Sequence, residues 1–344
     1  MSEREYDVIV IGAGAVGENV ADRTVQGGMS TVIVEAELVG GECSYWACMP
    51  SKGLLRSAAA LRAAQDLDGA KQAVTGTVDV AGVLRRRDAI THDWDDASQV
   101  GWLDKTGIDL VRGHAEFTGV KRVRVTAEDG SVTDLVARHA VAVATGSAAL
   151  LPDIPGLRDI APWTSRDATS AKSAPASLAV IGGGVVAVEM ATAYAGFGTK
   201  VTLLVRTALL ENMEPFAAEL VEASLEKLGV TVRKGVEVTE AHRTDKNAVL
   251  ALSDGGRVVA EEVLVAIGRT PRTTDLGLES IGFQPGAWLG VDDTLQVKGT
   301  DWLYAVGDVN HRALLTHQGK YQARAAGDVI AARAKGLAVS DAPW

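Results

Sequence analysis

The chain has 344 residues, of which 47% are hydrophobic and only 5% are aromatic. Its length exceeds that of one small core and predicts two or more packed units. The 34 basic and 44 acidic residues give a formal net charge of −10. This charge argues against a general nucleic-acid-binding protein, because affinity for phosphate backbones depends on cationic side chains.

The N-terminal stretch MSEREYDVIVIGAGAVG is acidic, and no basic segment precedes an apolar one in it. It therefore does not resemble a secretory signal. No apolar run of the sequence approaches the roughly 18–20 residues that span a bilayer. We expect a cytoplasmic protein without membrane contacts.

The first predicted strand, residues 6–11, ends in a glycine-rich turn that opens a helix. Gly12, Gly14 and Gly17 form the pattern G-x-G-x-x-G, and a second strand follows the helix and ends at Glu35. In this context Gly12 permits the turn, Gly14 admits a pyrophosphate and Gly17 lets helix and strand pack closely. The helix N-terminus attracts phosphates, and Glu35 is placed to accept hydrogen bonds from ribose hydroxyls. The segment predicts a dinucleotide site.

The only two cysteines, Cys43 and Cys48, follow in the stretch GGECSYWACMPSK. A structural disulfide, a zinc site, two small hydrophobes and a redox pair are the open explanations. A cytoplasmic disulfide that closes so short a loop would stabilise little, and zinc lacks further Cys or nearby His ligands. Cysteines also pack as small hydrophobes, so the spacing favours a redox pair without establishing it.

The middle of the chain predicts helices and then a small sheet. Residues 52–105 carry apolar side chains every three to four residues, which predicts mostly helix. We interpret the arginine run at 85–87 as a solvated helix end. Residues 108–145 alternate in polarity and break at glycines, which predicts an antiparallel meander. The proline-rich connector at 151–156 predicts the crossover into a second domain.

A second strand–turn–helix–strand unit repeats the first. Gly182, Gly184 and Ala187 take the positions of its three glycines. Two dinucleotide sites in one chain favour electron transfer between two dinucleotides over a decayed duplicate kept for packing. The second strand ends at Arg206 where the first ends at a carboxylate, and an arginine favours the 2′-phosphate of NADP(H). A solvated surface arginine is the alternative reading.

The last part of the chain predicts a hairpin around residues 254–256, a strand in EVLVAIGRTP and a helix from His317 to Lys335. We therefore predict an α/β fold with two Rossmann-like dinucleotide-binding domains, each a parallel sheet in a three-layer arrangement, together with an antiparallel meander.

The stretch GGECSYWACMPSK resembles the redox-active motif of the class I pyridine nucleotide–disulfide oxidoreductases, such as glutathione reductase, dihydrolipoamide dehydrogenase and mercuric reductase. VATGS, IGGGVVAVEMA, AIGRTP and LYAVGDV follow in the order of that family. The resemblance implies an FAD-binding domain in two parts, residues 1–153 and 276–344. An NAD(P)-binding domain, residues 154–275, interrupts it.

The resemblance also implies roles for individual residues. Hydride would pass from NADPH, with NADH less favoured, to FAD and on to a Cys43–Cys48 disulfide. Cys48 would lie against the flavin and Cys43 would face the substrate. Lys52 and Glu189 resemble the family's ion pair near the flavin. The expected FAD contacts are Gly12, Gly14, Gly17, Glu35, Lys52, Ala115, Gly146, Glu189, Asp308 and His317, and the expected nicotinamide-dinucleotide contacts are Gly182, Gly184, Ala187, Arg206 and Gly268.

Two features depart from the family. Tyr45 and Trp46 stand between the cysteines, where they could fill the disulfide-side cleft, stack on an aromatic substrate or simply pack. Family members continue into a C-terminal interface domain that forms the homodimer and supplies a His–Glu acid–base pair, whereas this sequence stops at Trp344. We expect either a truncated chain or disulfide exchange that lacks this general acid. His317 is a cofactor contact or a substitute proton donor.

We expect an enzyme that reduces a small-molecule disulfide, with no metal site. Two alternatives stay open. One is an NAD(P)H dehydrogenase that reduces quinones directly from the flavin. The other is a cofactor-binding fragment without turnover.

Overall fold

The computed structural model describes residues 3–339, and the chain divides into two compact units. The first unit holds the chain up to Tyr45, residues 94–148 and the chain from Thr270 onward. The second holds residues 46–93 and 149–269. The assignment of residues 1–153, 154–275 and 276–344 to cofactor domains stays a prediction.

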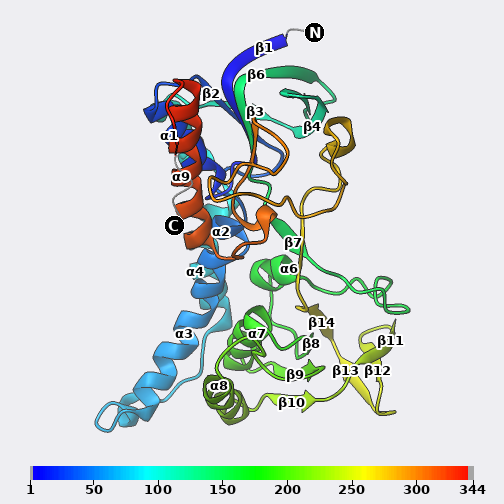
Figure 1. The fold of residues 1–344 in the computed structure, drawn as a ribbon. Coiled ribbons are helices and arrows are strands. Elements are labelled where there is room, and N and C mark those ends of the chain that lie inside the picture. Colours follow the sequence, from blue (N-terminus) through cyan, green and yellow to red (C-terminus); the bar gives the residue numbers. More distant parts are fainter. Residues whose placement is uncertain (1–2, 340–344) are drawn as a thin grey trace. The chain divides into compact units, whose positions relative to one another are not determined.

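Among the described residues, seven strands form the sheet of the first unit (Figure 1). They are β1 (Glu3–Ile11), β2 (Thr31–Glu35), β3 (Asp109–Arg112), β4 (His114–Gly119), β5 (Arg122–Thr126), β6 (Val132–Val143) and β16 (Leu303–Ala305). The order is β3-β2-β1-β6-β5-β4, and β16 pairs with β6. β3, β2, β1, β6 and β16 run parallel, whereas β4, β5 and β6 form an antiparallel meander.

The antiparallel meander predicted for residues 108–145 is thus confirmed from β4 onward. The prediction is wrong for residues 109–112, which do not belong to the meander. These four residues pair in parallel with β2, with Leu110 opposite Ile33 and Val111 opposite Val34. Alternating polarity is typical of both kinds of strand when one face is exposed, so the pattern alone does not reveal the partner.

Two helices lie side by side in the first unit, α1 (Gly17–Gln26) and α9 (Thr316–Ala334) (Figure 1). The guanidinium of Arg23 on α1 donates two hydrogen bonds to the carboxylate of Asp328 on α9. α9 confirms the predicted C-terminal helix to within one residue at each end. The unit also holds α2 (Gly41–Tyr45) and α5 (Ala97–Thr106).

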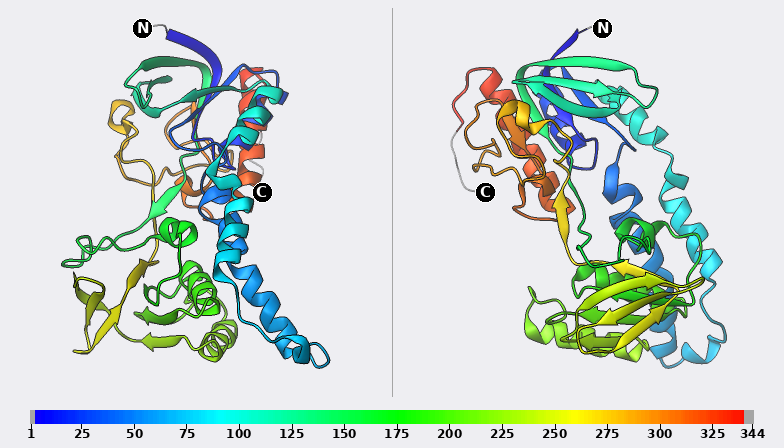
Figure 2. Two further views of the ribbon diagram at one scale, coloured as in Figure 1. Left: turned by 180° about the vertical axis from the view of Figure 1, so that it is seen from behind. Right: turned by 90° about the vertical axis from the view of Figure 1, so that its right-hand side faces the viewer.

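The second unit contains a parallel sheet of four described strands in the order β10-β9-β8-β14, and three antiparallel strands in the order β11-β12-β13 (Figure 2). The strands are β8 (Ser177–Ile181), β9 (Lys200–Val205), β10 (Thr231–Lys234), β11 (Val238–Arg243), β12 (Ala248–Leu252), β13 (Arg257–Ala260) and β14 (Glu262–Val265). The hairpin predicted around residues 254–256 joins β12 to β13 and is confirmed.

Both faces of the parallel sheet in this unit are buried, as expected when each face carries its own layer. Leu178 and Val180 pack into the cluster that includes side chains of the helix after β8, whereas Ala179 and Ile181 pack against the antiparallel strands. The described helices of the unit are α3 (Cys48–Asp66), α4 (Val80–Ile90), α6 (Ser165–Ser170), α7 (Val185–Gly196) and α8 (Pro215–Lys227).

The arginine run at 85–87 corrects one prediction. Arg85 and Arg86 are exposed, but Arg87 is fully buried. Its guanidinium donates to the carbonyl oxygens of Thr169 and Ala171 and to the carboxylate of Asp88. A buried charge is tolerated when its donors are satisfied. No local pattern could indicate these acceptors, because two of them are backbone atoms more than 80 residues away.

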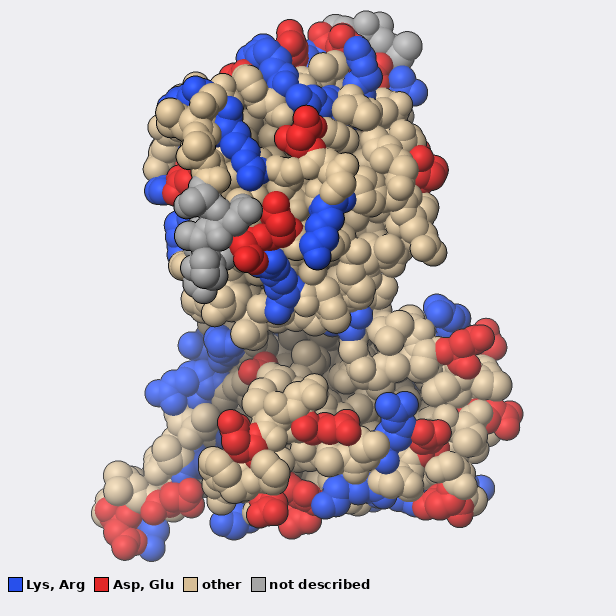
Figure 3. Space-filling view, in the orientation of Figure 1, with Lys and Arg blue, Asp and Glu red and all other residues tan. Residues whose placement is uncertain are grey.

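The chain passes between the units through β7 (Ser147–Ala149) and β15 (Arg269–Pro271), which pair with one another. On the face shown in Figure 3, basic and acidic side chains are interspersed. Within residues 3–339, no helix combines the length and apolar character that crossing a bilayer requires.

Candidate active site

The first glycine turn lies between β1 and α1 and is shaped by close backbone contacts. Gly12 has a φ of +98°, and a β-carbon on it would lie 2.6 Å from the carbonyl oxygen of Ala144. A β-carbon on Gly17 would lie 1.8 Å from the carbonyl oxygen of Gly12. Gly14, between them, meets only the Cα of Gly41, at 3.9 Å. The first and third glycines are therefore required by the fold, while the second leaves an opening at the N-terminus of α1.

Glu35, the last residue of β2, forms a hydrogen bond with this glycine turn. Its carboxylate accepts a hydrogen bond from the backbone N–H of Ala13 at 2.6 Å and another from that of Glu37 at 2.8 Å. Burial raises the pKa of Glu35, and these two donors oppose the rise. The N–H of Gly113 donates to the carbonyl of Glu35 at 2.9 Å, which brings the start of β4, with its buried Ala115, beside the turn.

Two buried side-chain oxygens at this turn, Oγ1 of Thr145 and Oε1 of Glu18, have no hydrogen-bond partner within the described chain. The Cα of Thr145 lies 3.2 Å from the β-carbon position of Gly12. Burial raises the pKa of Glu18 to about 7; Lys320 lowers it and Glu35 raises it further. Unsatisfied buried polar groups point to a missing partner. A dinucleotide, which has phosphates and hydroxyls, fits this turn.

Asp308 begins a 3₁₀ turn (Asp308–Asn310) that follows β16. It accepts a hydrogen bond from the hydroxyl of Ser147 at 2.6 Å. Gly146, the neighbour of Ser147, accepts one from the N–H of Arg272 at 3.1 Å. The structure thus brings Asp308 and Gly146 together, whereas His317 is an exposed residue at the start of α9.

The two cysteines lie on consecutive helices, Cys43 in α2 and Cys48 as the first residue of the 19-residue α3, and both are half-buried. Arg272 anchors the first of these helices, since its guanidinium donates to the carboxylate of Glu42 at 3.1 Å and to the carbonyl of Ser147 at 3.3 Å. A thiolate at the first position of a long helix is stabilised by the free N–H groups and the helix dipole. Cys48 occupies such a position.

Lys52 and Glu189 lie on α3 and α7 of the second unit. Lys52 is exposed and Glu189 is half-buried. The described residues form no ion pair between them at 4.0 Å or less. Their expected role near the flavin stays a prediction.

The aromatic residues between the cysteines have different environments. Tyr45 is fully buried, and its hydroxyl lies 3.4 Å from the carbonyl of Asp95. It serves packing, so it does not offer a ring for a substrate to stack on. Trp46 is half-buried, and the guanidinium of Arg166 lies over its ring, 4.1 Å from the ring centroid. One face of the indole is therefore covered.

The second glycine turn lies at the carboxyl edge of the parallel sheet in the second unit. A β-carbon on Gly182 would lie 2.3 Å from the carbonyl of Ala266, which follows β14. Gly268 lies two residues further on, and Gly184 precedes the first residue of α7. Arg206 follows β9 at the same edge. The carboxyl ends of parallel strands are where dinucleotides bind in such sheets.

Two of the residues predicted at this second turn differ in exposure. Ala187 is fully buried in α7, as a residue that packs helix against strand should be. Arg206 is exposed, and its only described ion pair is a long one of 3.9 Å to Glu237. The guanidinium is therefore accessible to an anion, as the predicted 2′-phosphate contact requires.

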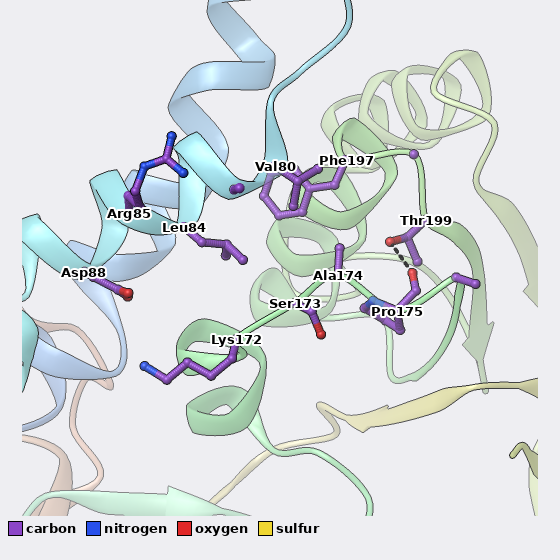
Figure 4. A pocket seen from close by; sticks show the side chains of 13 residues that line it. Val80, Leu84, Arg85, Asp88, Lys172, Ser173, Ala174, Pro175, Phe197 and Thr199 are labelled. Carbon is purple, nitrogen blue, oxygen red and sulfur yellow. Dashed lines mark hydrogen bonds between the residues drawn. The ribbon is translucent and has the colours of Figure 1, made fainter.

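A pocket of about 580 Å³ lies elsewhere in the second unit, between α4 and the segments that precede β8 and β9 (Figure 4). Leu84, Phe197 and Pro175 line it together with the charged residues Lys172 and Arg85. None of the predicted site residues contributes to its lining.

Sequence reasoning missed several residues that the fold places at the site. Ser147 contacts Asp308 across 161 positions, Arg272 contacts Glu42 across 230, and Thr169 contacts Trp46 across 123. No local pattern signals such partners. Within residues 3–339, no group of three or more His, Cys, Asp or Glu side chains is arranged to hold a metal ion.

The sequence profile described as "Pyridine nucleotide-disulphide oxidoreductase" matches residues 6–328. The chain belongs to this family, which confirms the predicted resemblance. It is 31% identical to the mercuric reductase of Staphylococcus aureus over 341 residues, covering 97% of this chain and 60% of that protein. It is 34% identical to the dihydrolipoyl dehydrogenase of Chlorobaculum parvum over 341 residues, covering 96% of this chain and 72% of that protein.

The fold is similar to that of a solved protein, the HOCl-induced flavoprotein disulfide reductase RclA of Escherichia coli in its Cu(II) complex. The TM-score is 0.84 at 23% identity, with 94% of this chain and 70% of that chain covered. This likeness confirms the predicted fold class. The chain spans about 60% of the length of the mercuric reductase.

Proposed function

We propose that the chain binds FAD and NADPH and reduces a small-molecule disulfide through a Cys43–Cys48 redox pair. The observation that carries the proposal is the placement of the only two cysteines: Cys48 starts a long helix, and Cys43 lies on the short helix just before it. Two glycine turns at helix N-termini, one in each unit, support two dinucleotides.

FAD, when bound, supplies two-electron chemistry that accepts hydride from a nicotinamide and passes electrons to a disulfide. In the net reaction one NADPH gives up a hydride and becomes NADP⁺. The acceptor's S–S bond breaks, takes the two electrons and, with one further proton from solvent, becomes two thiols. The protein's own disulfide opens and re-forms once in each cycle.

The chain's residues hold the reactants and control the charge on sulfur. The first turn of α3 favours the thiolate form of Cys48. Cys43 can then act as the nucleophile in exchange with an external disulfide. At the first glycine turn, Glu35, Thr145 and the N–H groups of α1 would hold the FAD phosphates and ribose. Asp308, fixed by Ser147, would accept a hydrogen bond from the ribityl chain.

Arg206 supports NADPH over NADH as the electron donor. It is exposed at the carboxyl end of β9, where the second ribose of a bound dinucleotide is expected. A guanidinium offers bidentate hydrogen bonds to a phosphate and offers nothing comparable to a ribose hydroxyl.

Variants of the cysteines test the proposal. Cys43→Ser, Cys48→Ser and the double variant should lose NADPH-dependent reduction of lipoamide, oxidised glutathione or an aromatic disulfide by about 100-fold or more, because the group that acts covalently is gone. Reduction of the quinone menadione should survive. Ser57→Ala, on the same helix, is the control and should leave both activities unchanged.

Disulfide reduction by the double variant at the wild-type rate would contradict the proposal. A wild-type protein that reduces menadione but no disulfide would instead support a quinone reductase. Bound FAD with no turnover of any acceptor would indicate a cofactor-binding fragment.

A further inference from the structure

The short helix α6 holds Trp46, the residue two positions before Cys48, at two separate points. The hydroxyl of Thr169 lies 2.8 Å from the carbonyl oxygen of Trp46. The carbonyls of Ser165 and Arg166 lie further from it, at 3.0 and 3.1 Å. From the same helix, the guanidinium of Arg166 covers the indole ring of Trp46. Backbone and side chain of Trp46 are therefore both attached to α6.

α6 is itself fixed at both ends, which makes it a firm support. Thr164 and Asp167 form a capping box at its N-terminus. At its C-terminal end, the buried guanidinium of Arg87 donates to the carbonyls of Thr169 and Ala171. Few six-residue helices are stable alone, so these side chains define where α6 lies.

A third contact links α6 to the nucleotide-binding part of the second unit. The buried hydroxyl of Tyr194 on α7 donates to the carbonyl of Ala168 at 2.7 Å. α7 is the helix that begins at the second glycine turn. A continuous series of contacts thus runs from α7 through α6 to Trp46.

Among the described residues, no side chain caps the start of α3. Its N-cap residue is Ala47, which has no side chain able to cap the helix, and no side-chain cap is present. Serine, threonine, asparagine and aspartate normally perform this task and fix the entry of the chain. The contacts that hold Trp46 therefore help to set the orientation of Cys48, the first helical residue.

We propose that Thr169 and Arg166 are positioning residues for the redox segment: they hold the carbonyl and the indole ring of Trp46 and so set the orientation of the Cys48 thiol. The inference rests on the proposed function, because orientation matters only if Cys48 takes part in redox chemistry. It also explains why an aromatic residue stands between the cysteines, since a small residue would give Arg166 no ring to cover.

The test compares Thr169→Val, which keeps the shape and removes the hydroxyl, with Thr169→Ser, which restores it. Arg166→Met and Arg166→Lys form a second pair, in which only lysine keeps a cation over the ring. Thr192→Val is the matched control, because within residues 3–339 that hydroxyl donates only to the carbonyl of Val188 in α7, at 2.8 Å. The FAD-loaded proteins are reduced anaerobically with NADPH.

Four quantities are then measured: the long-wavelength absorption of a thiolate in contact with oxidised flavin, the rate of thiol alkylation by iodoacetamide, and the steady-state rates of disulfide reduction and of menadione reduction. Thr169→Val should lose most of the absorption band. Its kcat for disulfide reduction should fall about 10-fold, which is the effect expected from the loss of one hydrogen bond. Menadione reduction and the KM for NADPH should change less than about 2-fold, and Thr169→Ser should recover the band. Arg166→Met should behave like Thr169→Val.

A wild-type band and alkylation rate in both Thr169→Val and Arg166→Met would overturn the positioning role while leaving the proposed function intact. Absence of the band and of disulfide reduction in the wild-type protein would overturn both. If Thr169→Val fails to fold, the Arg166 pair gives the answer on its own.

Discussion

A β-carbon on Gly17 would lie 1.8 Å from the carbonyl oxygen of Gly12. No side-chain rotation relieves that contact, because both partners are part of the main chain. The first turn of α1 and the end of β1 must therefore be joined by glycine at this position if the N-terminus of the helix is to face a cofactor phosphate.

Gly17→Ala should consequently lose FAD during purification and lower the midpoint of thermal unfolding by several degrees, since a clash of this size displaces the helix. The measurement is the ratio of flavin to protein absorbance together with a thermal melt. Gly101→Ala is the control, because a β-carbon there meets no atom within 4 Å, and alanine favours the helix. Full FAD occupancy in Gly17→Ala would contradict this account of the turn.

The buried guanidinium of Arg87 gives a second prediction. Arg87→Met leaves the carbonyls of Thr169 and Ala171 without their donor and should reduce the free energy of unfolding by about 3 kcal/mol. Urea unfolding followed by tryptophan fluorescence measures the loss. Arg85→Met, whose side chain is 72% exposed, should change the value by less than about 0.5 kcal/mol. Equal effects of the two substitutions would mean that the buried contacts of Arg87 do not stabilise the fold.

Arg85 and Arg87 also show which features of the structure can be predicted from the sequence. The glycine turns, the parallel strands and the cysteine pair could be predicted, because each depends on residues close together in the chain. The burial of Arg87, the pairing of Ser147 with Asp308 and the attachment of Thr169 to Trp46 could not, because each joins segments more than 80 residues apart. β3 shows the same limit, since its polarity pattern predicted a strand but not that its partner is β2.

Glu18 predicts a pH dependence of stability. Its pKa is raised from an ordinary value of 4.5 to about 7, mainly by burial. The native state therefore holds the proton more tightly than the unfolded chain, and stability is lost as the pH rises from about 4.5 to about 7. The loss amounts to roughly 3 kcal/mol at most.

Glu18→Gln removes this dependence. The free energy of unfolding of the variant, relative to that of the native protein, should therefore be higher at pH 8 than at pH 5. Urea unfolding at the two pH values, with cofactor-free and FAD-loaded protein, measures the difference. Glu240→Gln, at an exposed position, should show no such increase. The same pH dependence in Glu18→Gln and the native protein would exclude the buried carboxyl as its source.

Arg206 predicts which nicotinamide cofactor is preferred. Arg206→Ala should raise the KM for NADPH by about 10- to 100-fold, the value of one charged hydrogen-bonded contact, and leave the KM for NADH nearly unchanged. Initial rates with menadione as acceptor measure both without involving the cysteines. Arg233→Ala, on the neighbouring strand β10, removes a half-buried arginine paired with Asp254 and serves as the control. A parallel rise in both KM values would show that Arg206 does not contact the 2′-phosphate.

An anaerobic titration of the FAD-loaded protein with NADPH tests the central claim most directly. If the two cysteines form a redox pair, the first equivalent of NADPH should produce a long-wavelength absorption band from a Cys48 thiolate in contact with oxidised flavin. The band should be absent in Cys48→Ser. Simple bleaching of the flavin by that first equivalent, without a band at any pH between 6 and 9, would contradict the redox pair.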